Sequence, residues 1–173
     1  MLKKPLIAAI LSVLIVLAST LVSVHARLDP ICADFRDEFH SSEILKGLTQ
    51  YCSYSTEILQ LAADAKLQTR EAHDSVEALH KALGEDSAAK LFSRYQKLSA
   101  AISDVKASLL RSELSEADRQ ALERLDAALS SAQTQISESD YNSRTSFLLR
   151  KELGSFSCFV ARLCGVRLPE QFA

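Results

Sequence analysis

The chain has 173 residues, and its 20 Lys and Arg against 22 Asp and Glu give a formal net charge of −2. With four glycines, three prolines, no tryptophan and abundant Ala, Leu, Ser and Glu, the composition predicts an all-α protein. The slightly negative net charge, with charges of both signs interspersed, argues against nucleic acid as a partner. No stretch of the sequence alternates β-branched with polar residues, so no β-sheet is predicted.

Residues 6–24 form an apolar run without charge, proline or glycine, preceded by Lys3 and Lys4. As a helix this run would rise roughly 29 Å, about the thickness of a bilayer core. We therefore expect residues 1–26 to be an N-terminal transmembrane anchor, with the lipid bilayer as the partner of residues 6–24. The alternative is a cleaved signal sequence, since Val24-His25-Ala26 offers small residues at a cleavage site.

The charges that flank the run predict its orientation. Lys3, Lys4 and the terminal amine precede it, whereas Arg27 and Arg36 follow it among several acidic residues. The positive-inside bias then predicts a single-pass protein of the cell membrane with an extracytoplasmic body. A cytoplasmic body is the alternative.

Residues 27–41 are polar and contain Pro30, so we expect a juxtamembrane stalk broken at that proline. Residues 42–173 are expected to form a helical bundle. Apolar residues recur with a period near 3.5 over 42–83 and over 87–111, and Ser115 with Asp118 forms a capping-box-like start for a third helix reaching about residue 153. Short loops between them predict an antiparallel three-helix bundle, or up to four helices.

The expected helix lengths differ, and this predicts an uncovered surface. A first helix of about 42 residues would rise roughly 63 Å, whereas the second would return only roughly 38 Å. The start of the first helix would then expose an apolar stripe at Ile44, Leu48 and Tyr51. We expect a protein partner or a homo-oligomer to cover this stripe, unless residues 31–40 pack against it.

A short apolar segment closes the chain. Gly154 is expected to interrupt the third helix, and Gly165 to stop a last helix that carries Phe156, Phe159, Val160 and Leu163. We expect these side chains to fold over the open end of the bundle. The alternative is insertion into a membrane surface, favoured by Arg150, Lys151, Arg162 and Arg167 nearby.

The C-terminal third carries Tyr141-Asn142, then Ala161 with Gly165-Val166 four residues later, and the final aromatic Phe172. This pattern resembles the end of the LemA family of single-anchor bacterial proteins. Leu148-Leu149 stands where that family has a second aromatic-Asn pair, so the chain resembles a short, divergent member. The resemblance implies a helical bundle associated with a membrane. It carries over no catalytic residue.

Few residues suggest chemistry. His73, Glu77 and His80 share one helix face, and Glu77 with His80 forms a Glu-x-x-His pair. A metal site inside a helical bundle needs a second such pair, which the sequence lacks, so we expect a solvated polar face. The spacing of Cys158 and Cys164 on a helix is too wide for a disulfide, and we expect mostly free thiols.

No phosphate-binding loop, nucleophile elbow or zinc-protease motif occurs. We therefore expect no catalytic residue, no cofactor and no metal. The expected function is that of a non-enzymatic interaction or scaffold module at the cell envelope. The alternative is a ligand- or metal-sensing extracytoplasmic helical domain.

Overall fold

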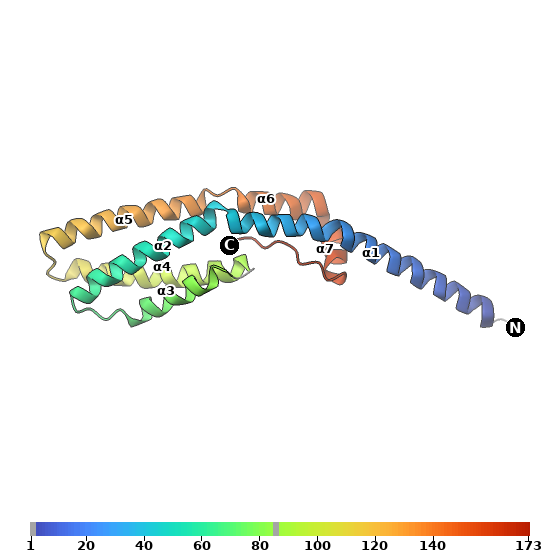
Figure 1. The fold of residues 1–173 in the computed structure, drawn as a ribbon, viewed down its shortest axis with the longest axis horizontal. Helices are drawn as coiled ribbons and strands as arrows, with labels where there is room; N and C mark the ends of the chain where they lie inside the picture. The colour runs from blue at the N-terminus through green and yellow to red at the C-terminus, as the bar shows by residue number, and fades with distance from the viewer. Residues whose placement is uncertain (1–2, 85–86) are drawn as a thin grey trace. The chain divides into compact units, whose positions relative to one another are not determined.

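The computed structural model describes residues 3–84 and 87–173, and the described chain is helical with no strand. The elements, in chain order, are α1 (Lys3–Ser41), α2 (Glu43–Asp64), α3 (Arg70–Ala82), α4 (Ala88–Arg111), α5 (Glu116–Ser137), α6 (Tyr141–Phe147), the π-helical η1 (Leu148–Leu153) and α7 (Gly154–Leu163) (Figure 1). The expected all-α fold with an antiparallel bundle is confirmed. The chain divides into unit 1, residues 1–37 and 143–169, and unit 2, residues 38–142 and 170–173.

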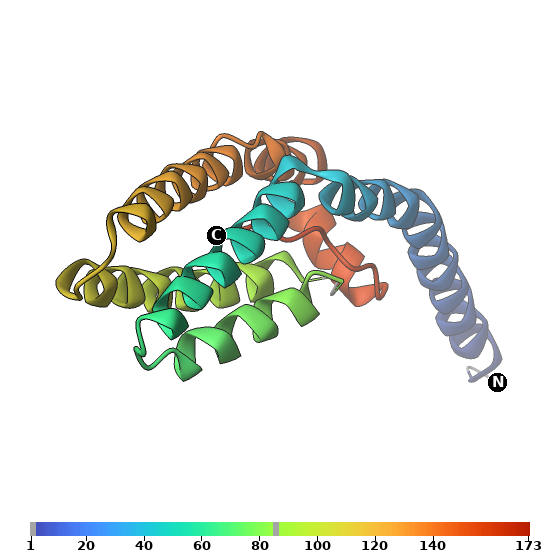
Figure 2. The same ribbon diagram turned by 60° about the vertical axis from the view of Figure 1, so that its left-hand side comes forward.

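Unit 2 contains a bundle of four helices, α2 to α5. Consecutive helices run in opposite directions (Figure 2), and α2 packs against α3, α4 and α5 while α3 packs against α4. Most of the seam positions expected from the 3.5-residue period are buried, because each helix turns its apolar stripe inward. The largest fully buried side chains of this core are Ile44, Leu48, Ile58, Leu59, Leu79, Leu91, Leu98, Ile102 and Leu109.

The expected long helix over residues 42–83 is wrong, because the chain turns between α2 and α3. Lys66 has a φ of 59°, in the left-handed region that side chains other than glycine rarely adopt. Its N–H donates to the carbonyl of Ala63 at 2.9 Å, and the N–H of Leu67 donates to the carbonyl of Ala62 at 2.9 Å. These two bonds form a Schellman motif, and Leu67 packs against the core that contains Ala62.

This turn removes the mismatch in helix lengths. α2 and α5 each have 22 residues, and they pack together closely where Gly47 of α2 meets Ile136 of α5. Ile44, Leu48 and Tyr51 are consequently at most 2% exposed. The expectation that these three residues form an exposed interaction stripe is wrong, since α5 and the neighbouring helices cover the start of α2.

The third expected helix is also shorter than its apolar pattern suggested. Ser115 caps α5 as expected, because its Oγ accepts from the N–H of Asp118 at 3.2 Å. The helix ends at Ser137, and a new helix, α6, begins at Tyr141. Gly154 has a φ of 64° where η1 passes into α7, which agrees with the expected interruption there.

Unit 1 contains most of α1, and its apolar run is exposed. The large hydrophobic side chains of residues 7–22 are 40–68% exposed, and α1 is long and apolar enough to cross a membrane. A helix near an N-terminus with these properties is also found in signal sequences. The expected break at Pro30 is wrong, because α1 continues helically through this proline to Ser41.

Residues 27–37 do not form a bare stalk, because α7 packs against them. Cys32 of α1 is fully buried together with Ala161 and Val166, and Leu28, Cys164 and Leu168 pack against this small core. α7 ends in a second Schellman motif, in which the N–H of Val166 donates to the carbonyl of Ala161 at 3.0 Å. Gly165 supplies the left-handed residue with a φ of 74°, so it stops the helix as expected.

Candidate functional site

Asn142 binds the end of the chain by two hydrogen bonds. Its Nδ2 donates to the carbonyl of Phe172 at 2.7 Å, and its Oδ1 accepts from the N–H of Phe172 at 2.7 Å. Next to it, the hydroxyl of Tyr141 donates to the carbonyl of Glu170 at 2.9 Å. The Tyr-Asn pair therefore satisfies the carbonyl of Glu170 and both backbone polar groups of Phe172.

The ring of Phe172 then completes an aromatic cluster in unit 2. It lies 5.1 Å from the ring of Phe92 in an edge-on arrangement, 6.1 Å from Tyr95 and 6.5 Å from Phe39, measured between centroids. Tyr141 stands 4.9 Å from Phe39. Since these distances suit favourable aromatic pairs, the side chain of Phe172 is part of the core of unit 2.

Glu170 caps the N-terminus of α4. The Oγ of Ser87, the N-cap residue, donates to Glu170 Oε2 at 2.8 Å, and the N–H of Ala89 donates to the same oxygen at 3.4 Å. A carboxylate at a helix N-terminus satisfies orphan N–H groups and interacts favourably with the helix dipole. Sequence reasoning missed this contact, because the two partners are 83 residues apart and no local pattern marks Glu170 as a cap.

The four positions that carry the family resemblance thus have structural contacts. Tyr141 and Asn142 hold the tail by hydrogen bonds to its main chain. Ala161 is fully buried against Cys32, and Gly165 adopts the φ that ends α7. None of these contacts places a reactive group beside a base or an open site.

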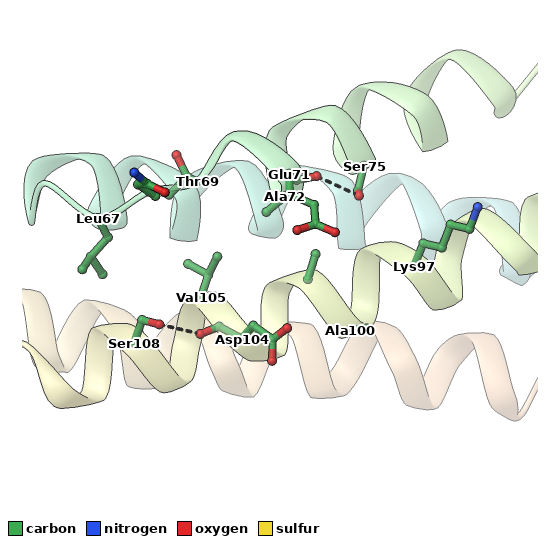
Figure 3. A pocket seen from close by; sticks show the side chains of 12 residues that line it. Leu67, Thr69, Glu71, Ala72, Ser75, Lys97, Ala100, Asp104, Val105 and Ser108 are labelled. Carbon is green, nitrogen blue, oxygen red and sulfur yellow. Dashed lines mark hydrogen bonds between the residues drawn. The ribbon is translucent and has the colours of Figure 1, made fainter.

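A groove of about 530 Å³ lies between α3 and α4 in unit 2. Figure 3 shows Ala100 and Val105 of α4 pointing toward α3, and the carboxylate of Glu71 pointing into the space between the helices. The lining residues are Leu67, Gln68, Thr69, Glu71, Ala72, Ser75, Lys97, Ala100, Ala101, Asp104, Val105 and Ser108. Small side chains form much of the lining, and charged ones of both signs contribute to it.

The two serines of this groove bond to their own helices. Ser75 Oγ donates to the carbonyl of Glu71, and Ser108 Oγ donates to the carbonyl of Asp104, each at 2.9 Å (Figure 3). Neither hydroxyl is therefore aimed at a ligand or held by a base.

The polar face of α3 is exposed, as expected. Glu77 makes a 2.5 Å ion pair with Lys81, and its hydrogen bond to Lys81 lowers the pKa of Glu77. His73 and His80 are also exposed. Within residues 3–84 and 87–173, no group of three or more His, Cys, Asp and Glu side chains is arranged to hold a metal ion.

The four cysteines are free thiols. Cys32 and Cys52 are buried, whereas Cys158 and Cys164 are half-buried. Burial raises the pKa of the Cys52 thiol to about 11, and burial also raises that of Cys32. A thiol with a raised pKa is a poor nucleophile at neutral pH, so neither buried cysteine has the environment of a catalytic one.

Comparison of the chain with protein-family models, with curated proteins and with solved structures found no match.

Proposed function

We propose that this protein is a membrane-anchored helical-bundle module of the LemA type, which acts at the cell envelope by interaction and not by catalysis. One observation carries the proposal: the large apolar side chains of α1 from Ile7 to Val22 are exposed along one continuous helix. Exposed apolar area of this extent requires a cover, and its length matches a bilayer core. The positive-inside bias of Lys3 and Lys4 favours an extracytoplasmic body.

The interior of unit 2 supports the non-catalytic part of the proposal. Leu, Ile and Ala fill its seam, and the motif residues Tyr141 and Asn142 bind main chain. We place the partner at the groove between α3 and α4 of unit 2. Its small side chains allow close approach of another helix, and its volume accommodates several side chains.

Membrane retention tests the anchor. Full-length protein should remain in the membrane fraction after alkaline carbonate extraction, and mass spectrometry should find its N-terminal peptide intact. A Leu14→Lys variant, with a charge at the centre of the run, should be extracted because insertion there costs about 3 kcal/mol. A mature chain that begins after Ala26 would overturn the proposal.

Site-specific photocrosslinking tests the partner surface. A photoreactive residue at Ala100, which lines the groove, should give a defined crosslinked product in intact cells. The matched control is Ser103, which is also exposed on α4 but does not line the groove. Equal crosslinking at both positions, or none at either, would contradict a partner at the groove.

The alternative function, a ligand-sensing extracytoplasmic domain, is favoured by the groove volume alone, since 530 Å³ falls in the range of small-molecule sites. Under that alternative, Ala100→Phe would fill the groove and abolish thermal stabilisation by the ligand. Under the interaction proposal, the same variant abolishes the product of a photoreactive residue placed at Ser75, which also lines the groove.

A further inference from the structure

Helix α7 exposes an apolar pair. Phe159 is 60% exposed and Leu163 is 65% exposed, and their spacing of four residues places them on one helix face. Arg162 is exposed beside them, whereas Ala161 on the opposite face is buried against Cys32. The expectation that the side chains of this segment fold over the end of the bundle is therefore wrong for Phe159 and Leu163, while Val160 is half-buried and the side chain of Phe156 lies outside those that the structure describes. α7 exposes an apolar face at Phe159 and Leu163.

The place where α7 packs on α1 defines a depth relative to a membrane. Leu28, which packs against the small core around Ala161, and Cys32, which is buried in it, follow the last residue of the apolar run, Val24, by four and eight residues. Along a helix these spacings correspond to about 6 and 12 Å. The headgroup region on each side of a bilayer is about 5–8 Å thick, since it adds 10–15 Å to a core of about 30 Å. When residues 6–24 span the core, Leu28 lies at the level of the headgroups and Cys32 about 4–7 Å beyond them. The small core that contains Ala161 of α7 therefore borders the headgroup region.

The charge of the segment around α7 suits an anionic surface. Residues 143–169 contain five basic residues and one acidic residue, Glu152, a net charge of +4, although the whole chain carries −2. Residues 25–37 of α1 contribute two arginines and three aspartates, so the net charge of unit 1 beyond the apolar run is +3. Each Lys or Arg near an anionic leaflet contributes about 1 kcal/mol of attraction. The exposed members of the basic set are Arg144, Arg150, Lys151, Arg162 and Arg167.

Basic and aromatic side chains also lie together elsewhere in unit 1. Lys151 Nζ lies 5.4 Å from the ring centre of Phe147, which is exposed, and the guanidinium of Arg144 lies 5.9 Å from that of Phe35. A hollow of about 530 Å³ is lined by Phe35, Ser143, Arg144, Phe147 and Leu148. Aromatic rings with basic residues at their faces are typical of protein surfaces at the headgroup level.

We propose that α7 is an interfacial helix that binds the anionic surface of the same bilayer that α1 enters. Phe159 and Leu163 insert at the boundary between headgroups and acyl chains, and Arg162 and Arg167 contact lipid phosphates. This inference rests on the proposed function only in that α1 must span the membrane. The protein is then held at the lipid by two elements, and the surface of unit 1 is fixed against the bilayer.

The chain contains no tryptophan, so the fluorescence of a single introduced tryptophan reports on its own position alone. A full-length Phe159→Trp variant is reconstituted into vesicles of phosphatidylcholine and phosphatidylglycerol whose acyl chains carry bromine as a quencher. Its fluorescence should be blue-shifted and quenched by about half or more, as expected for an indole near the acyl boundary. The matched control is Leu110→Trp, at an exposed apolar position on α4 in unit 2. Equal quenching of the two variants, or none for Phe159→Trp, would overturn the inference.

Two further measurements separate the causes of failure. Replacing phosphatidylglycerol by phosphatidylcholine, or introducing Arg162→Gln and Arg167→Gln, should reduce the quenching of the Phe159→Trp variant. Alkaline extraction of the same vesicles reports on α1 alone. Retained protein with an unquenched indole contradicts only the role of α7, and if that indole is blue-shifted without quenching, a protein contact covers it instead. Extracted protein contradicts the anchor.

Discussion

Gly47 of α2 faces Ile136 of α5 so closely that a Cβ at residue 47 would lie 2.6 Å from Cγ1 of Ile136 and 3.2 Å from the carbonyl oxygen of Ala132. A separation under 3.0 Å between carbon atoms requires a neighbour to move. The contact therefore sets how near the two helices approach at the start of α2, where Ile44 and Leu48 are buried. Glu43, one turn earlier, accepts a hydrogen bond from Gln135 of α5.

Gly47→Ala should destabilise the protein. The overpacking cost of about 1–3 kcal/mol exceeds the roughly 1 kcal/mol by which alanine favours a helix over glycine. Denaturation of the full-length protein in detergent, followed by far-UV circular dichroism, measures the difference. Gly84→Ala is the control, because a Cβ there meets nothing within 4 Å. In a double-mutant cycle, Ile136→Ala should remove most of the penalty, and additive effects would contradict the contact.

Lys66→Gly should stabilise unit 2 by about 0.5–1 kcal/mol. The left-handed backbone costs a residue with a Cβ about 1–2 kcal/mol, and the greater freedom of glycine in the unfolded chain offsets part of the gain. The denaturation midpoint is the measurement. Lys66→Ala keeps the Cβ and should change little. A loss of stability in the glycine variant would argue that the chain does not turn at residue 66.

Asn142→Asp should loosen the C-terminal tail by about 1–3 kcal/mol, because a carboxylate cannot donate to the carbonyl of Phe172. Release of the last residues by carboxypeptidase should then be faster than in the wild type. Tyr141→Phe, which loses one bond to Glu170, should have a smaller effect. Below about pH 4 the new carboxyl is protonated and can donate again, so the defect should shrink as the pH falls. A defect independent of pH would contradict this account.

Thiol labelling should follow burial. A pKa of about 11 for Cys52, against an ordinary 9, reduces its thiolate fraction near pH 8 by about a hundredfold. Cys158 and Cys164 should react first with a maleimide, and all four thiols should react alike in denaturant. Mass spectrometry of labelled peptides gives the order. Labelling of Cys52 in the native protein as fast as Cys164 would show that the α2 core opens readily.

The sequence predicted α4 and the start of α5 because their signals are local. The period of 3.5 residues identified α4, and Ser115 with Asp118 marked the start of α5 to the residue. Gly154 and Gly165 were identified as interruptions because glycine is the usual residue at positive φ. The same reasoning missed the turn after α2, since Lys66 adopts that backbone without glycine or proline nearby.

The missed turn explains the wrong candidate site. With one helix over residues 42–83, Ile44, Leu48 and Tyr51 had no neighbour to cover them. With two shorter helices, α5 reaches them and they are core. The hydrogen bond from Tyr141 to Glu170 was equally hidden, since its partners are 29 residues apart and neither residue has a local pattern that requires the other.

Composition and periodicity alone determined that this protein is helical, that residues 6–24 can span a bilayer and that the bundle seam is apolar. These properties depend on residues within a few turns of each other. Tertiary structure decided which apolar residues stay exposed, because burial depends on where distant helices end. The sequence predicted an exposed apolar surface at the start of α2, whereas in the structure those residues are buried and Phe159 and Leu163 of α7 are exposed.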